Sequence, residues 1–324
     1  MIIQAMSQSP AVPVSVSVST SDALEGVALL SHLGVIRVVG DDAVKFLQGQ
    51  LTNDFALLKP DQARLAAFLS AKGRMQASFV GLVRIPGEVL LVCSRDILEP
   101  VRKRLSMFVM RAKAQLTDAT GEIALYGIAG STVAALAGDE LPAWSRRDIG
   151  HAQLVGLPPA ADRARALWLA PAGEPAPGGP VMASDTWLWG EVASGVATLT
   201  APVVDAFVPQ MLNYESVGGV NFKKGCYPGQ EIVARSQFRG TLKRRAYIVH
   251  SDSALAVGAD VFHSGDLSQP TGTVVQVAAA PSGGFDAIVS MQIASAEDGT
   301  LHAAAAAGPL LSLRALPYPL LDDI

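Results

Sequence analysis

The chain is poor in cysteine and in charge, and each shortage excludes a class of protein. Cys93 and Cys226 are the two cysteines among 324 residues, so at most one disulfide can form, and in a reducing compartment both are expected as free thiols. Charged residues make up 17% and hydrophobic residues 50% of the sequence, which excludes a disordered chain. The net charge of -4 excludes an overall basic footprint for nucleic acid.

Long apolar runs and a secretory leader are also missing. The longest apolar stretches, such as GVALLSHLGVIRVVG, are broken by glycine, histidine and arginine and are too short to span a membrane. The N-terminus MIIQAMSQSPAVPVSVSVST lacks the basic start and compact apolar run of a signal peptide. We therefore expect residues 1–20 to form a mobile tail and the protein to be cytoplasmic.

The familiar cofactor motifs are absent as well. The five histidines are scattered, and neither cysteine belongs to a CxxC pair, so no metal site is predicted. The chain has no GxGxxG after a strand, no GxxxxGK[ST] loop and no GxSxG elbow. Nucleotide, metal and serine-hydrolase chemistry therefore have no support in the sequence.

What stands out is the segment KGCYPGQE, from Lys224 to Glu231. Glycines on both sides of Cys226 permit positive φ and a close approach to the backbone. Residues 223–245 hold seven Lys or Arg and a single acid, and cations near a thiol favour the reactive thiolate. Spacing alone leaves an alternative open, in which Cys226 is a small buried residue and the cations are a solvated face.

The pattern of apolar residues divides the chain. DTWLWGEVASG is expected to be helical, and a helix is expected to begin near QEIVAR. After residue 240 the pattern changes to short strands separated by Gly, Ser and Asp turns, which predicts a small all-β barrel or sandwich over residues 241–324.

Several stretches resemble a known family. FVPQMLNYESVGGVNFKKGCYPGQEIVARSQFRG resembles the signature of the YgfZ-type folate-binding proteins, which belong to the superfamily of the glycine-cleavage T-protein, an aminomethyltransferase. GDDAVKFLQGQLTNDFALL and LSAKGRM resemble the opening domain of that superfamily, and RRAYIV onward resembles its terminal β-barrel.

The resemblance implies an α+β fold in a ring-like, three-lobed arrangement around a central folate cavity. Two interleaved α+β lobes would occupy residues 21–240, with a boundary near residue 118, and the barrel would follow. The implied cofactor is tetrahydrofolate. The implied role is assembly or maintenance of iron–sulfur proteins, including cluster-dependent tRNA-modifying enzymes, through the cysteine motif.

Two departures from the superfamily affect these expectations. Ala77 and Ser78 stand where aminomethyltransferases carry adjacent aspartates, one of them catalytic, and the missing carboxylate argues against aminomethyl transfer. Many relatives carry a glutamate that can accept from the pterin edge. Ala193 stands at that position here, and Glu191 is expected to point to a different helix face.

The resemblance assigns candidate roles to residues of both motifs. Cys226 is the expected functional thiol. Lys224 would tune it or meet an anionic group, with a solvated lysine as the alternative. Tyr227 would stack on a planar ligand, and Trp187 would line the cavity, with core packing as the alternative for both. Cys93, in the apolar strand VLLVCS, is expected in the core.

The remaining candidates are polar. Gln230 and Glu231 would contact the ligand or fix the loop, or else cap the helix that starts there. Arg235 and Arg239 would hold the folate glutamate tail, because guanidinium matches carboxylate geometry, or form a surface face. Asn53 and Asp54 would line the cavity, or act as turn or cap residues.

Three functions compete at this point. The first is a folate-binding protein that supports iron–sulfur client proteins through Cys226. The second is a folate-dependent one-carbon transferase. The third is an RNA- or protein-interaction module that uses residues 223–245, and it ranks last because the net charge of -4 argues against direct nucleic-acid binding. No membrane partner is expected, and a monomer is the expected state.

Overall fold

The computed structural model describes residues 23–240 and 242–321. The predicted tail of residues 1–20 lies outside the described residues. Within the described ranges, no helix is both long and apolar enough to cross a membrane.

The first sheet contains most of the N-terminal third of the chain. Its antiparallel strands lie in the order β3-β4-β5-β2-β6. They are β3 (Arg64–Leu69), β4 (Met75–Ile85), β5 (Glu88–Ser94), β2 (Leu33–Val39) and β6 (Gln115–Asp118). Two helices, α1 (Ala43–Gln48) and α2 (Arg95–Ser106), pack on this sheet, and their apolar residues share a buried cluster with it. Cys93 lies in that cluster at 1% exposure, so its predicted place in the core is confirmed.

The second sheet takes its first strand from before β2, so the two sheets interleave along the chain. Its order is β1-β7-β10-β9-β8. The strands are β1 (Gly26–Leu29), β7 (Ile123–Ala129), β10 (Arg163–Pro171), β9 (Ala152–Ala160) and β8 (Arg146–Ile149). Helix α3 (Ser131–Ala137) packs on one of its faces, against β7 and β10.

A closed barrel follows, as the turn pattern after residue 240 predicts. Its strands are β11 (Arg244–Ser251), β14 (Phe285–Gln292), β13 (Gly272–Ala279), β12 (Asp260–His263), β15 (Leu301–Ala303) and β16 (Leu310–Arg314). Closure pairs all six strands and leaves no free edge. The short helix η4 (Ile293–Ala296) follows β14.

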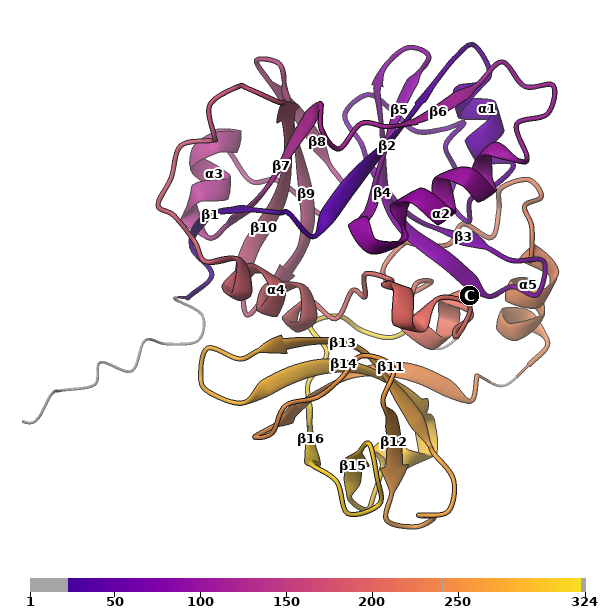
Figure 1. The fold of residues 1–324 in the computed structure, drawn as a ribbon, viewed down its shortest axis with the longest axis vertical. Helices are drawn as coiled ribbons and strands as arrows, with labels where there is room; N and C mark the ends of the chain where they lie inside the picture. Colours follow the sequence, from indigo (N-terminus) through magenta and orange to yellow (C-terminus); the bar gives the residue numbers. More distant parts are fainter. Residues whose placement is uncertain (1–22, 241, 322–324) are drawn as a thin grey trace, which may run out of the picture.

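Helix α4 (Ser184–Ala193), also expected from the sequence, connects the second sheet to the barrel. The indole Nε1 of Trp189 donates to Asp286 Oδ2 of β14 at 2.7 Å. Figure 1 shows the two sheets side by side above the barrel, with α4 and the short helices η2 (Ala201–Val203) and η3 (Pro209–Leu212) between them.

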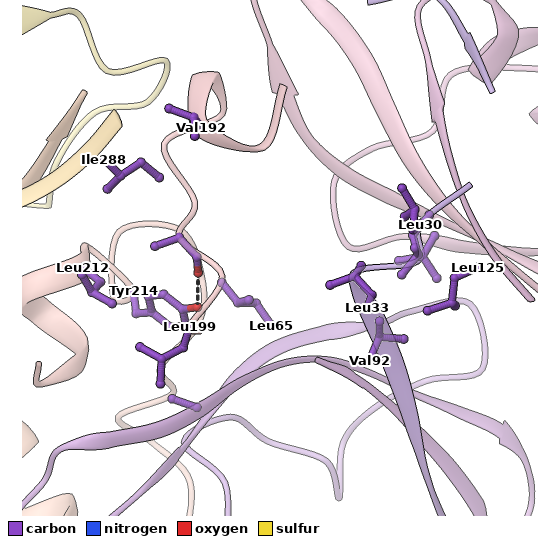
Figure 2. Close-up of a cluster of buried hydrophobic side chains, with 14 of the residues drawn as sticks. Leu30, Leu33, Leu65, Val92, Leu125, Val192, Leu199, Leu212, Tyr214 and Ile288 are labelled. Carbon is purple, nitrogen blue, oxygen red and sulfur yellow. Dashed lines mark hydrogen bonds between the residues drawn. The ribbon is translucent and has the colours of Figure 1, made fainter. Parts of the chain in front are cut away.

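One buried cluster joins all three parts. It includes Val92 of the first sheet, Leu125 of the second and Ile288 of the barrel (Figure 2). Tyr214 is fully buried beside them, and its hydroxyl donates to the carbonyl of Ala197 at 2.6 Å. Burying Tyr214 therefore leaves no unpaired hydroxyl, which would otherwise cost free energy.

Candidate functional site

Cys226 lies in an exposed loop between two buried anchors. Cys226 is exposed, whereas the exposed fractions of Lys224 and Tyr227 are only 7% and 6%. The Lys224 ammonium donates to the carbonyls of Gln48 and Leu51, each at 2.5 Å, and lies 4.9 Å from the centroid of the Tyr227 ring. The anchors hold the loop while the side chain between them faces outward, so the alternative that Cys226 packs in the core is wrong.

Lys224 is therefore not the solvated lysine of the alternative interpretation. Burial lowers its pKa to about 8, although the nearby Asp54 carboxylate acts in the opposite direction. One of its hydrogen bonds satisfies the carbonyl of Gln48, the last residue of α1, which has no further helical turn to bond it, and the other satisfies that of Leu51 beyond the helix. Arg245 is also buried, in an ion pair with Glu215. The cationic run of residues 223–245 therefore does not form a single face.

The N-terminal motif clamps the segment that precedes Cys226. Thr52 Oγ1 donates to Gly219 O at 2.6 Å, and Asn53 Nδ2 donates to Gly218 O at 2.6 Å. The backbone N–H of Asn221 donates to the carbonyl of Thr52 at 2.9 Å. Two stretches that look unrelated in sequence thus form one unit, and the donors of Asn53 are used in holding it.

Asp54, beside Asn53, has the local role that a turn residue has. Its Oδ1 accepts from the backbone N–H of Leu57 at 3.0 Å. Its exposed fraction is 8%, and it lines neither the pocket that contains Trp187 nor the pocket that contains Asn53.

The segment after Cys226 meets the LSAKGRM motif through two glycines. Gly229 has φ +78°, and a Cβ there would lie 2.6 Å from the carbonyl oxygen of Ser70. Gly73 has φ +71°, and a Cβ there would lie 2.8 Å from Ile232 Cβ. Helix α5 (Gln230–Phe238) starts directly after Gly229, as predicted, with Glu231 exposed in its first turn. Only glycine fits both the backbone conformation and the contact.

An inner cavity of about 70 Å³ lies where the two sheets and α4 meet, and polar groups project into its apolar wall. Glu191, from α4, is 7% exposed. Its Oε1 accepts from Trp187 Nε1 at 2.8 Å and contacts His32 Nε2 at 3.0 Å, and its Oε2 accepts from Gln276 Nε2 at 2.9 Å. Burial raises the pKa of Glu191, but the hydrogen bond from His32 and the charges of His32 and Arg165 outweigh it, so the pKa is lowered. Glu191 is therefore a buried carboxylate at neutral pH.

Arg165, from β10, places a cation in the same cavity. It is 3% exposed, and its guanidinium carbon lies 4.4 Å from the centroid of the Trp187 ring. Burial lowers its pKa to about 10, against the charge of Glu191. Its Nε has no hydrogen-bond partner among the described residues. A buried donor without a partner is rare in proteins and is suited to a ligand or a bound water.

An outer pocket of about 420 Å³ adjoins the inner cavity, since Leu65 and Trp144 line both. Asn53 and Gly218 also line it, and Arg64 and Lys223 make it cationic. Of the predicted ligand residues, Trp187 thus lines the inner cavity and Asn53 the outer pocket.

The lining residues that sequence reasoning missed include Arg64, Trp144, Arg165 and Lys223. Arg165 lies in the strand RARALWLAP, where its inward direction follows from strand alternation only once the buried face is known. Arg64 also lies in a strand, β3, and Trp144 and Lys223 lie in irregular segments.

Four other predicted residues lie elsewhere. Arg235 lines a separate groove with Lys243 and Arg244, and Arg239 is exposed at the end of α5. Gln230 and Glu231 open α5 and line neither cavity.

The two departures from the aminomethyltransferase pattern can now be located. Ser78 lines the inner cavity, and its Oγ accepts from the backbone N–H of Leu199 at 2.9 Å. Ala77 is fully buried in the core of the first sheet. Glu191, two residues before Ala193, lines the inner cavity, so a carboxylate is present there although Ala193 itself carries none. Helix α4 is buried on more than one side, so Ala193 and Glu191 both contact other parts of the protein.

Comparisons with known proteins agree with this fold. No model of a known protein family matches the chain. It is 31% identical over 232 residues to the tRNA-modifying protein YgfZ of Hamiltonella defensa subsp. Acyrthosiphon pisum (strain 5AT). The aligned region covers 68% of this chain and 68% of that one. It is 29% identical over 301 residues to the protein of the same name from Edwardsiella ictaluri (strain 93-146), covering 87% of this chain and 89% of that one.

A solved structure is similar as well. The glycine cleavage system aminomethyltransferase T from Bartonella henselae superposes with a TM-score of 0.67 at 16% identity, over 94% of this chain and 88% of that one. At this identity the likeness shows the fold alone, and it confirms the predicted T-protein-like architecture.

Proposed function

The chain belongs to the YgfZ family, and we propose that it binds tetrahydrofolate and supports the assembly or maintenance of iron–sulfur proteins through Cys226. The clients would include cluster-dependent tRNA-modifying enzymes, in line with the name of the relatives. The observation that carries the folate proposal is the cavity that combines the Glu191 carboxylate with the unpartnered Nε of Arg165 and the ring of Trp187.

The pterin end would enter the inner cavity. A pterin edge presents adjacent donors, and Glu191 supplies two acceptor oxygens that His32, Trp187 and Gln276 now occupy. At about 70 Å³ the cavity is small for a ring system, so we expect the pterin donors to replace those of His32 and Gln276. The three lobes would then surround the ligand as a ring.

The glutamate tail would extend into the outer pocket. Arg64 and Lys223 there can meet its carboxylates, and a guanidinium does so with two parallel hydrogen bonds. Arg235 and Arg239 remain the alternative pair for the tail. Removal of each pair separately distinguishes them: only the correct pair should weaken the binding of tetrahydrofolate that carries several glutamates.

Cys226 would supply a thiol to client proteins at the mouth of this site. It follows Lys223 of the outer pocket by three positions, and its side chain is exposed. Lys224, Tyr227, Gln230 and Glu231 would hold the loop in place. The expected monomeric state and cytoplasmic location remain predictions.

Aminomethyl transfer is the weaker candidate. Ser78, which carries no charge, faces the cavity at a position where the transferases have a carboxylate near the reacting amine. We expect no product above background in a glycine-cleavage assay, and turnover would favour the transferase instead.

Calorimetric titration with tetrahydrofolate tests the ligand. We expect binding by the wild type and by Cys226→Ala, and at least about tenfold weaker binding by Glu191→Gln, because a charged acceptor is lost. Glu140→Gln, an exposed position that lines neither cavity, is the matched control and should bind as the wild type does. Thermal melts confirm that each variant is folded. No heat of binding with the wild type would refute the folate proposal.

Complementation tests the thiol. In cells that lack the gene, Cys226→Ala should fail to restore a cluster-dependent tRNA modification measured by mass spectrometry. Cys93→Ala should restore it, because that thiol is inside the core. Full restoration by Cys226→Ala would remove the thiol from the mechanism.

A further inference from the structure

Six cations from three separate segments gather around α5. We call this set the basic groove: Arg235, Lys243 and Arg244, which line a groove, together with Lys72, Arg74 and Arg239 on the adjoining turn and at the end of α5. Residues 70–74 touch α5 at the contact between Gly73 and Ile232. Arg235, Lys243 and Arg244 line one groove of about 420 Å³. Figure 1 shows α5 at the edge of the molecule.

The cations of the basic groove are not neutralised by neighbours. Within residues 23–240 and 242–321, none of the six forms an ion pair within 4.0 Å. Arg37, Arg102 and Arg146 elsewhere do pair with carboxylates. One acid, Glu231, lies on these segments, and a second, Asp205, contacts one of them. Glu231 is in the first turn of α5, and Asp205 Oδ1 accepts from Ser70 and Gln76 instead of a cation.

The like charges are also close together. Burial and the charge of Arg74 both lower the pKa of Arg244. Such a cluster disfavours folding slightly through self-repulsion, and a bound polyanion would relieve it. In a chain of net charge -4, this concentration of positive charge indicates a specific surface and not an overall composition.

An exposed aromatic ring lies among these charges. Phe238 is 55% exposed, and its ring packs edge-on against Phe222 at a centroid distance of 5.4 Å. Arg235, Phe238 and Arg239 are spaced i, i+3 and i+4 and are therefore neighbours on the surface of α5. The ring is held by Phe222 and leaves part of its surface open to solvent.

We propose that the basic groove binds single-stranded or loop RNA, with its cations on the phosphates and Phe238 stacked on a base. Charged grooves combined with exposed aromatic rings are the way proteins hold unpaired nucleic acid, and RNA commonly offers such unpaired loops. An acidic peptide would satisfy the charges without a planar base for Phe238. The groove shares no lining residue with the inner cavity or the outer pocket, and the RNA proposal takes Arg235 and Arg239 as phosphate ligands instead of ligands of the folate tail.

Fluorescence anisotropy with a labelled RNA hairpin that carries a single-stranded loop tests the proposal. The wild type should bind with an affinity that falls steeply with salt, with a log–log slope of about -4 for six phosphate contacts on a single strand. Lys72→Glu, Arg239→Glu and Lys243→Glu combined should weaken binding at least about tenfold and reduce the slope by about 2.

A matched triple variant controls for net charge. Lys59→Glu, Arg104→Glu and Arg314→Glu reverse three exposed cations that do not belong to the six of the basic groove, and binding should change less than about twofold. Equal weakening by both triples would mean that only the overall charge matters, and the proposal would be overturned. Failure of the wild type to bind the hairpin at low salt would overturn it too.

Phe238→Ala separates RNA from other polyanions. It should weaken hairpin binding about tenfold and leave the binding of a fully paired duplex nearly unchanged, because only an unpaired base can stack. If polyglutamate binds as tightly as the hairpin and Phe238→Ala has no effect, the surface is one for acidic proteins and the RNA proposal fails. Lys243→Glu should leave tetrahydrofolate binding intact, so this result and the folate result can be told apart.

Discussion

The two cysteines have the same side chain and opposite surroundings. Cys93 lies in β5 at 1% exposure, where burial, with the nearby charges of Asp118 and Asp96, raises the pKa of its thiol to about 12. Cys226 is exposed in a loop held by Lys224 and Tyr227. A thiol with so high a pKa is inert at neutral pH, whereas an exposed one can react.

The difference arises from how each cysteine is held. Cys93 needs only an apolar strand that packs on α2, and its neighbours in sequence supply that strand. Cys226 is displayed because the residues beside it are anchored to α1 and to the loop of residues 70–74. Residues close in sequence are thus enough to bury Cys93, whereas holding Cys226 in an exposed loop requires contacts with residues distant in sequence.

Native thiol reactivity should give the largest contrast. With Ellman's reagent, Cys226 should react more than about a thousandfold faster than Cys93, because access to Cys93 requires an opening of the core. Cys226→Ser should abolish the fast phase, and Cys93→Ser should retain it. Comparable rates for both thiols in the folded protein would contradict the difference in exposure between them.

Replacement of Gly229 should be the most damaging change to the loop. Gly229→Ala introduces a side chain at φ +78° and 2.6 Å from a carbonyl oxygen, so the free energy of unfolding should fall by about 3 kcal/mol. Urea denaturation measures it. Gly225→Ala is the control, since a Cβ there meets nothing within 4 Å, and it should change stability by less than about 1 kcal/mol. Equal losses would show that the contact with Ser70 is unimportant.

Loss of the Lys224 anchor should come next. Lys224→Met keeps the apolar stem but leaves the carbonyls of Gln48 and Leu51 without their donor, and should cost about 2 kcal/mol in urea denaturation. Lys223→Met, next to it and exposed, should cost less than about 0.5 kcal/mol. If the two substitutions cost the same, Lys224 does not anchor the loop.

The smallest effect should be the contribution of Cys93 to the pH dependence of stability. Its folded pKa of about 12 lies above the ordinary 9.0, so its contribution to stability is complete below pH 9.0 and is lost as pH rises toward 12. Between about pH 8 and 10 the wild type should lose about 1 kcal/mol more than Cys93→Ala does. Urea titrations at several pH values measure it, and a slope unchanged in Cys93→Ala would contradict the burial argument.

Local patterns were sufficient for much of the fold. The barrel after residue 240, α4, the start of α5 and the burial of Cys93 all follow from turn residues and apolar runs that neighbours in sequence supply. The cavity was harder. Glu191 was not predicted to line it, and Arg165 was missed, because α4 and β10 are buried on more than one side and their patterns do not indicate which side holds the cavity.

The residues of the motifs are present in the chain itself: the lone exposed cysteine, its flanking glycines and the paired Thr52 and Asn53. Their structural roles depend on contacts between positions that are distant in sequence. Thr52 binds a carbonyl 167 residues away, and Lys224 binds one 176 residues away. Hydrogen bonds and close glycine contacts act over a few ångströms in space, so no local pattern encodes them. Only folding brings their partners together and turns Cys226 outward.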